Sequence, residues 1–127
     1  MVNNQSLKGV HKEAVAFFLK KINESIDEIR EKIPVTPKDL IQQINSATIE
    51  VESTPYYCIM KFNYDGVYEV YHNKTIEIQV VRENIPPIVF HMYLKNGKLY
   101  EFEYFKADSS KIHNEELFLG AVVIGVY

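Results

Sequence analysis

Apolar residues in the first third of the chain recur at alternating intervals of four and three positions, with charged residues between them. The series is Val15, Leu19, Ile22, Ile26, Ile29 and Ile33. This spacing places one apolar stripe along a helix and is typical of an amphipathic helix that packs on a sheet. A coiled-coil seam is the alternative, but Phe17 and Phe18 widen the stripe beyond such a seam. The pattern predicts one long helix from about residue 10 to residue 33.

A second, short helix is predicted after Pro34, which ends the first helix because proline lacks an amide donor. The segment from Thr36 to Asp39 offers a hydroxyl for the N-cap, a proline for the first helical position and a carboxylate in the first turn. Apolar Leu40 and Ile44 follow at helical spacing. We expect this helix to end near Asn45.

After residue 46 the chain is dominated by β-branched and aromatic residues, which favour β-strands. The pattern predicts strands over 48–52, 56–64, 67–71, 75–81, 88–94, 98–105 and 118–125. The dipeptides Asp65-Gly66 and Asn96-Gly97 are typical of two-residue hairpin turns, because both central residues of such turns adopt positive φ. Since the connections are short, we expect an antiparallel meander.

These elements together predict the α+β class in a single domain, 1–127. A long N-terminal amphipathic helix and a short second helix, over about 10–45, would pack on one face of the sheet. The sheet would be six- to seven-stranded and mainly antiparallel, over about 48–127. A chain of this length buries roughly two thirds of its unfolded surface, which is enough for a core without disulfides or metals.

The Asn96-Gly97 turn also predicts which side chains share a face of the sheet. With a two-residue loop, regular pairing from the turn onward places His91 opposite Phe102. His91 would then point away from Glu101 and Glu103. The hairpin therefore predicts a carboxylate-bearing face without a histidine.

Charge and cysteine content narrow the function further. The 127 residues carry a formal net charge of -3, which argues against a nucleic-acid-binding surface. The lone Cys58 lies in an apolar run, so we expect an inert thiol, no disulfide and a cytoplasmic location. No leader peptide and no run of about 20 apolar residues is present, so we expect no membrane span.

The residue types offer little for catalysis. The 4 histidines lack metal-ligand spacing, and the chain has neither a phosphate-binding glycine loop nor a serine-nucleophile motif. Glu101 and Glu103 lie about 7 Å apart on one strand, which suits an acid–base pair, but such alternation is more typical of a solvent-facing row. Asp108 is expected to cap a turn. We predict no catalytic residue, no metal and no cofactor, and therefore a protein that is not an enzyme.

Residues 85–112, IPPIVFHMYLKNGKLYEFEYFKADSSKI, resemble an uncharacterised family of small bacterial α+β domains. In that family a proline-containing turn and a strand lead to Asp/Asn-Gly, a Leu-x-Glu strand and a Lys-x-Asp tail. This chain departs from the family at Asn96, where Asp is frequent, and at Phe102 and Tyr104, where Leu and Ile or Trp are common. Some members look like immunity proteins of polymorphic toxins. The resemblance implies a toxin-neutralising binding protein.

The same turn, followed by Lys98, Leu99 and an aromatic strand, also looks like the last hairpin of the nuclear-transport-factor-2-like fold, which likewise begins with a long helix. That resemblance implies a small-molecule binding or isomerase-type domain with an apolar pocket. The fold normally has a third helix between its early strands and ends near its final hairpin, whereas residues 118–125 here add a strand. It is the alternative hypothesis.

The leading hypothesis is a non-enzymatic domain that binds a basic protein partner, such as a toxin. Tyrosines would supply aromatic anchors and carboxylates would steer the partner. The predicted partner-binding residues are Tyr100, Glu101, Glu103, Tyr104 and Asp108. The stretch Leu117–Tyr127 is apolar on both faces, which indicates either a buried strand or the contact of a homodimer.

Overall fold

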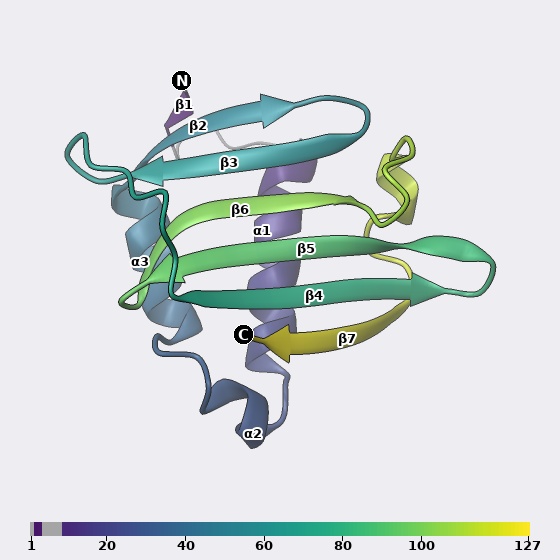
Figure 1. Ribbon diagram of the computed structural model, residues 1–127, viewed down its shortest axis with the longest axis horizontal. Helices are drawn as coiled ribbons and strands as arrows, with labels where there is room; N and C mark the ends of the chain where they lie inside the picture. Colours follow the sequence, from purple (N-terminus) through teal and green to yellow (C-terminus); the bar gives the residue numbers. More distant parts are fainter. Residues whose placement is uncertain (1, 4–8) are drawn as a thin grey trace.

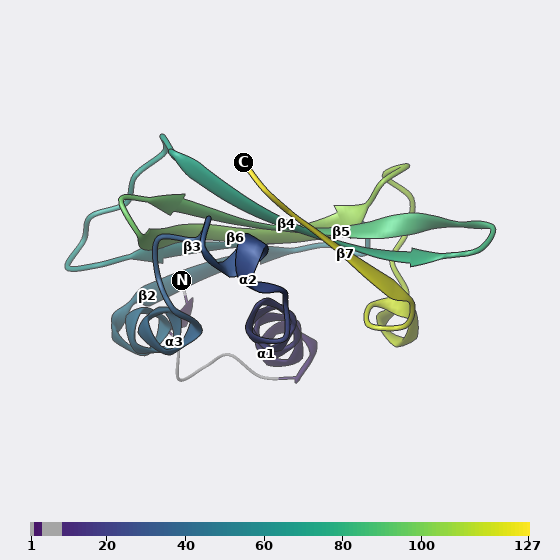
Figure 2. The same ribbon diagram turned by 90° about the horizontal axis from the view of Figure 1, so that it is seen from below.

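The structure is a computed structural model that describes residues 2–3 and 9–127. It contains a seven-stranded sheet with helices packed on one side (Figures 1 and 2). In chain order the elements are β1 (Val2–Asn3), α1 (Gly9–Asn23), α2 (Asp27–Arg30), α3 (Pro37–Ser46), β2 (Thr48–Ser53), β3 (Tyr57–Asn63), β4 (Lys74–Arg82), β5 (Ile85–Lys95), β6 (Lys98–Lys106), the 3-10 helix η2 (Asn114–Glu116) and β7 (Ala121–Val126). The predicted α+β class is confirmed.

The order of the strands differs from the predicted meander. It is β1-β2-β3-β6-β5-β4-β7, and every neighbouring pair is antiparallel. The chain leaves β3, crosses the end of the β5–β6 hairpin and enters the sheet again as β4 (Figure 1). β6 then returns beside β3, so the central pairing joins segments that are distant in sequence.

The predicted strand over 67–71 does not form. Asp65 and Gly66 make the expected tight turn, with φ of 54° and 82°, and Tyr64 pairs with Val67 in an isolated bridge. Pairing stops there because both edges of β3 are already occupied, one by β2 and the other by β6. A third strand therefore has no edge to join.

The predicted long helix is divided into α1 and α2. α1 ends at Asn23, and the chain turns at Ser25, whose hydroxyl donates to the carbonyl of Ile22 at 2.5 Å. A serine hydroxyl that bonds to nearby backbone in this way competes with the helix. The guanidinium of Arg30 donates to the carbonyl of Asn23 at 3.1 Å and holds α2 at the end of α1. Ile26 falls in the break and is 63% exposed.

α3 begins where the capping pattern predicted. The side chain of Thr36 accepts a hydrogen bond from the amide of Asp39 at 3.1 Å, and proline occupies the first turn. Later in α3, the Gln43 side chain donates to the carbonyl of Gly97 and accepts from the amide of Leu99, both at 2.9 Å. These two bonds fix the β5–β6 turn against the helix layer.

The core lies between α1, α3 and one face of the sheet. In Figure 2 both helices lie on the same side of the sheet. Phe18 of α1 meets Phe102 of β6 edge to face, with ring centroids 5.3 Å apart. Other core side chains with no exposed surface include Leu40, Met60, Phe62, Phe90 and Met92. The opposite face of the sheet has neither helix against it (Figure 2).

The register predicted for the β5–β6 hairpin is wrong beyond the turn. Tyr93 pairs with Glu101, which leaves Tyr100 as an extra residue, a β-bulge. A bulge of one residue reverses the face of every side chain that follows it. Glu103 therefore pairs with His91, and the two lie on the same face.

The bulge places each residue of β6 in a suitable environment. Leu99 and Phe102 are three positions apart, yet both have no exposed surface. Regular alternation between them would carry Glu101 into the core. The extra residue, Tyr100, is only 7% exposed and packs edge to face on Tyr64, with ring centroids 5.7 Å apart.

β7 is shorter than the strand predicted over 118–125 and pairs with β4. Leu117, before the strand, is fully buried in the core, whereas Val123 is 57% exposed. The stretch therefore contributes to the core of this chain. Its predicted role in a homodimer stays a prediction.

Candidate interaction face

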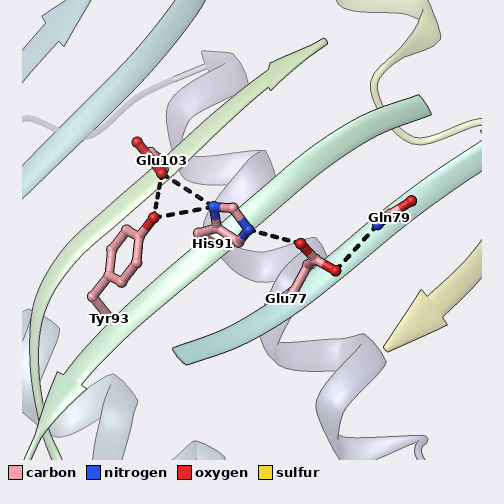
Figure 3. Close-up of polar contacts among 5 residues, drawn as sticks. All are labelled: Glu77, Gln79, His91, Tyr93 and Glu103. Carbon is pink, nitrogen blue, oxygen red and sulfur yellow. Dashed lines mark hydrogen bonds and ion pairs between the residues drawn. The ribbon is translucent and has the colours of Figure 1, made fainter. Parts of the chain in front are cut away.

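The sheet face that points away from α1 and α3, called the open face below, carries five polar side chains at its centre. Pairing places them: Glu77 on β4 lies opposite His91 on β5, which lies opposite Glu103 on β6. Paired residues on adjacent strands project from the same face, with Cβ atoms about 5 Å apart. Together with Gln79 and Tyr93 these residues form the polar cluster (Figure 3).

His91 bridges the two carboxylates of the polar cluster. Its Nε2 lies 2.9 Å from Oε1 of Glu77, and its Nδ1 lies 3.1 Å from Oε1 of Glu103. The hydroxyl of Tyr93 donates to the same Glu103 oxygen at 2.5 Å, and the Gln79 amide donates to Glu77 at 3.1 Å. The side chains of His91, Glu77 and Glu103 are 18%, 21% and 19% exposed, so water reaches them only in part.

These contacts favour the ionised form of all three groups. The hydrogen bond with Glu103 raises the pKa of His91, although burial opposes the shift. The same bond lowers the pKa of Glu103, with a further contribution from Tyr93. Burial of Glu77 acts against its ionisation, yet its hydrogen bonds to His91 and Gln79 lower its pKa overall. Both ring nitrogens of His91 face a carboxylate oxygen, which only accepts, so the geometry also favours an imidazolium between two carboxylates.

This protonation state limits the chemistry of the polar cluster. An imidazolium bonded at both nitrogens has no lone pair for a general base or a metal. No group of three or more His, Cys, Asp or Glu side chains within residues 2–3 and 9–127 is placed to hold a metal ion. The cluster can hold its strands in register and present excess negative charge.

Stability should depend on pH through the polar cluster. The pKa of His91 lies above its usual 6.5, so its contribution is complete below that pH and is lost as pH rises through the folded pKa. The pKa values of Glu77 and Glu103 lie below their usual 4.5, so their contribution is present above that pH and is lost as pH falls through the folded values. The three contributions overlap between pH 4.5 and pH 6.5.

The change that tests this is His91→Gln, measured by urea denaturation at a series of pH values. We expect the difference in unfolding free energy between the wild type and the variant to be largest in that window and to shrink on both sides. The control Glu13→Gln, on α1, should leave the pH dependence unchanged. A difference that stays constant across the series would contradict the ionised arrangement.

The structure brings together only part of the predicted partner-binding set. Glu101 and Glu103 project from the open face, and Glu101 accepts a hydrogen bond from Tyr68 at 2.8 Å. Tyr104 is 4% exposed on the helix side, with its hydroxyl 3.4 Å from Nδ1 of His11. Its burial on the helix side makes it unsuitable as a surface anchor, and the bulged Tyr100 is also buried.

Asp108 lies in the turn after β6, away from the other predicted residues. Its carboxylate accepts from the amide of Ser110 at 3.0 Å and from the Ser110 hydroxyl at 2.6 Å. These bonds lower the pKa of Asp108. The residue therefore closes a turn, as the sequence predicted.

Four members of the polar cluster were missed as site residues: Glu77, Gln79, His91 and Tyr93. Two sequence signals could have found them. The strict alternation of residues 75–80 already placed Glu77 on an exposed face. The interval of three between Leu99 and Phe102 is the signature of a bulge in an alternating strand, and a bulge would have brought Glu103 to the side of His91.

Cys58 lies on the helix side and is 1% exposed. Burial raises its pKa to about 11, although its Sγ lies 3.5 Å from Nδ1 of His11. A thiol with a raised pKa is a poor nucleophile. The structure thus gives this cysteine a packing role.

The fold and the site define a class: a two-layer α+β domain with one helix-free sheet face that bears a half-buried acidic cluster. Searches of family models, of curated proteins and of solved structures found no match to this chain. Within residues 2–3 and 9–127, the helices are too short or too polar to cross a membrane. The function is therefore argued from the surface itself.

Proposed function

We propose that this protein is a binding domain that recognises a basic partner protein through its open face. The observation that carries the proposal is the polar cluster: hydrogen-bonded His91, Glu77 and Glu103, with side chains 18%, 21% and 19% exposed, lie on a sheet face that neither α1 nor α3 covers. Burying charge is costly unless the charge is paired and hydrogen-bonded. A basic partner that covers this face would pair with the carboxylates while it removes the remaining water.

The charge of the open face favours a basic partner. Carboxylates on the strands of this face outnumber cations. The carboxylates are Glu50, Glu52, Glu77, Glu101 and Glu103, and the cations are Lys61, Lys95, Lys98 and His91. An excess of one sign on a binding face accelerates association with a partner of the other sign. That this partner is a toxin rests on the family resemblance of residues 85–112.

Aromatic side chains beside the polar cluster are suited to act as anchors. Phe105 lies next to His91, with ring centroids 5.8 Å apart, and Tyr93 stacks on His72 at 4.9 Å. Tyrosine and phenylalanine are enriched in the buried core of protein interfaces, and tyrosine there often contributes much of the binding energy. The open face thus combines anchors with steering charge.

The alternative hypothesis, a small-molecule or isomerase-type domain, needs an apolar pocket between helix and sheet. In this structure Phe18, Phe90 and Phe102 fill that layer and have no exposed surface. Such a site would also use a buried carboxylate with a raised pKa. The polar cluster does not provide one, since the pKa values of Glu77 and Glu103 are lowered. The open face therefore supports binding better.

A photo-crosslinking amino acid at Val123, on the open face and 57% exposed, tests the proposal in cells that make the protein. We expect one dominant crosslinked protein with a high isoelectric point. The same amino acid at Glu13, on the exposed side of α1, is the matched control and should yield no such product. Equal products at both positions, or none at Val123, would count against the proposal.

Once the partner is identified, its association rate measures the role of charge. The double change Glu50→Lys and Glu101→Lys should slow association by about tenfold at low salt and less at high salt. The double change Glu13→Lys and Glu28→Lys, at exposed positions of α1 and α2, is the control of equal charge change on another surface. An association rate that ignores both changes would remove the electrostatic part of the proposal.

A further inference from the structure

An apolar groove of about 900 Å³ runs between α1 and α3 on the side of the sheet opposite the open face. α1 and α3 lie side by side and run in opposite directions along it (Figure 1). Its floor and walls include Val15, Ala16 and Leu19 of α1 and Ile41 and Ile44 of α3. Ile41 is 48% exposed.

The charged residues that line this helix groove are all lysines. They are Lys12 and Lys20 of α1 and Lys38 of α3, and no carboxylate lines the groove among the described residues. None of the three lysines forms an ion pair with another described residue. The groove is therefore a positive apolar surface on a protein whose formal net charge is -3.

We infer that the helix groove binds an acidic amphipathic helix of a protein partner. The α1 side of the groove extends from Lys12 to Asn23, which at helical rise is about 16 Å, or three turns. A helix of that length laid between α1 and α3 buries apolar residues at positions i, i+3 and i+7. Lys12 and Lys20 are eight positions apart, about 12 Å, and would meet carboxylates about two turns apart on the partner.

The placement of the lysines selects this occupant over two others. A fatty acid carries one carboxylate at one end, whereas Lys12 and Lys20 are separated along the groove by about 12 Å. A second copy of this chain that docked α1 on α1 would bring Lys12 and Lys20 against their own counterparts, and like charges in contact are unfavourable. An acidic amphipathic helix would cover the apolar floor with its apolar face and pair its carboxylates with both lysines.

A displayed library of helical peptides tests the inference. Peptides of about 14 residues would carry fixed apolar residues at i, i+3 and i+7 and random residues at the flanking positions. We expect selection on the intact protein to enrich Asp and Glu at flanking positions about two turns apart. Enrichment of Lys or Arg, no enrichment, or no binder at all would overturn the inference.

Variants then locate the site of the selected peptide. Lys20→Glu with Lys38→Glu should weaken its binding about tenfold or more, and Ala16→Trp should abolish binding by filling the groove. Lys32→Glu with Lys111→Glu, two exposed lysines outside the groove, is the matched control and should bind as the wild type does. Circular dichroism confirms that each variant is folded.

Two further measurements examine the rejected occupants. The first is competition by dodecanoate for the bound peptide. If dodecanoate binds the groove more tightly than the peptide does, the groove is reassigned to a fatty acid. Sedimentation that shows a dimer broken by Ala16→Trp would reassign it to a second copy. Crosslinking at Val123 is independent of the groove, so the two proposals can fail separately.

Discussion

Replacing Phe102 by alanine is expected to lower the free energy of unfolding by about 3–5 kcal/mol. Phe102 has no exposed surface and lies at the meeting point of both layers. Its ring meets Phe18 of α1 at 5.3 Å and Phe90 of β5 at 6.3 Å between centroids. The change removes contacts with the helix and the sheet at once, and the surrounding layer can close the cavity only in part.

The matched control is Phe105→Ala on the same strand. Phe105 pairs with Val89 and Tyr57 on the open face and is partly exposed, so its loss should cost about 1 kcal/mol. Urea denaturation of both variants measures the difference. A larger loss for Phe105→Ala than for Phe102→Ala would mean that β6 is not oriented as described, because the regular register without the bulge would exchange the faces of these two residues.

The comparison shows why local patterns predicted some elements of this fold well. The start of α3 depends on Thr36 and Asp39, which are three positions apart, and its capping bond forms as expected. The Asn96-Gly97 turn is equally local, and both residues adopt positive φ, 52° and 79°. Signals contained within a few residues of chain survive folding because their partners are always close.

Features that depend on distant partners were not predictable in the same way. The strand order is set by which strand occupies the second edge of β3, and β6, about forty residues later, takes it. The bulge at Tyr100 depends on Tyr64 and Tyr68, whose rings cover it. The polar cluster depends on that bulge, since only the shifted register brings Glu103 to His91. The candidate site could not be predicted without the correct register of this one hairpin.

Replacing Glu116 by alanine is the second change with a large expected effect, about 3–5 kcal/mol of lost stability. Glu116 is 8% exposed and its Oε1 lies 2.7 Å from Nζ of Lys106, which is 7% exposed. Burial acts against ionisation of this carboxyl, but the bonds from Lys106 and from the His113 amide lower its pKa. Without Glu116, the hydrogen bond left to the ammonium of Lys106 within residues 2–3 and 9–127 is the one to the carbonyl of Lys111 at 3.2 Å.

Removal of the other partner, by Lys106→Met, should lower the free energy of unfolding by less than Glu116→Ala does. Glu116 would retain Arg82, whose guanidinium lies 3.3 Å away and is 30% exposed. The double variant with Lys106→Met and Glu116→Leu should lose less stability than the two single losses added together, because no buried charge is left without a partner. Urea denaturation of the two single variants and the double variant measures this coupling.

The exposed pair of Lys21 and Glu24, with its atoms 3.4 Å apart, is the control for a pair in water. Glu24→Ala should cost less than about 1 kcal/mol. If Glu116→Ala costs no more than Glu24→Ala, the carboxylate of Glu116 is not buried as described. A large loss for Glu116→Ala together with a strong coupling would show that the segment after β6 is fastened to the sheet by this pair, which is how Leu117 reaches the core ahead of β7.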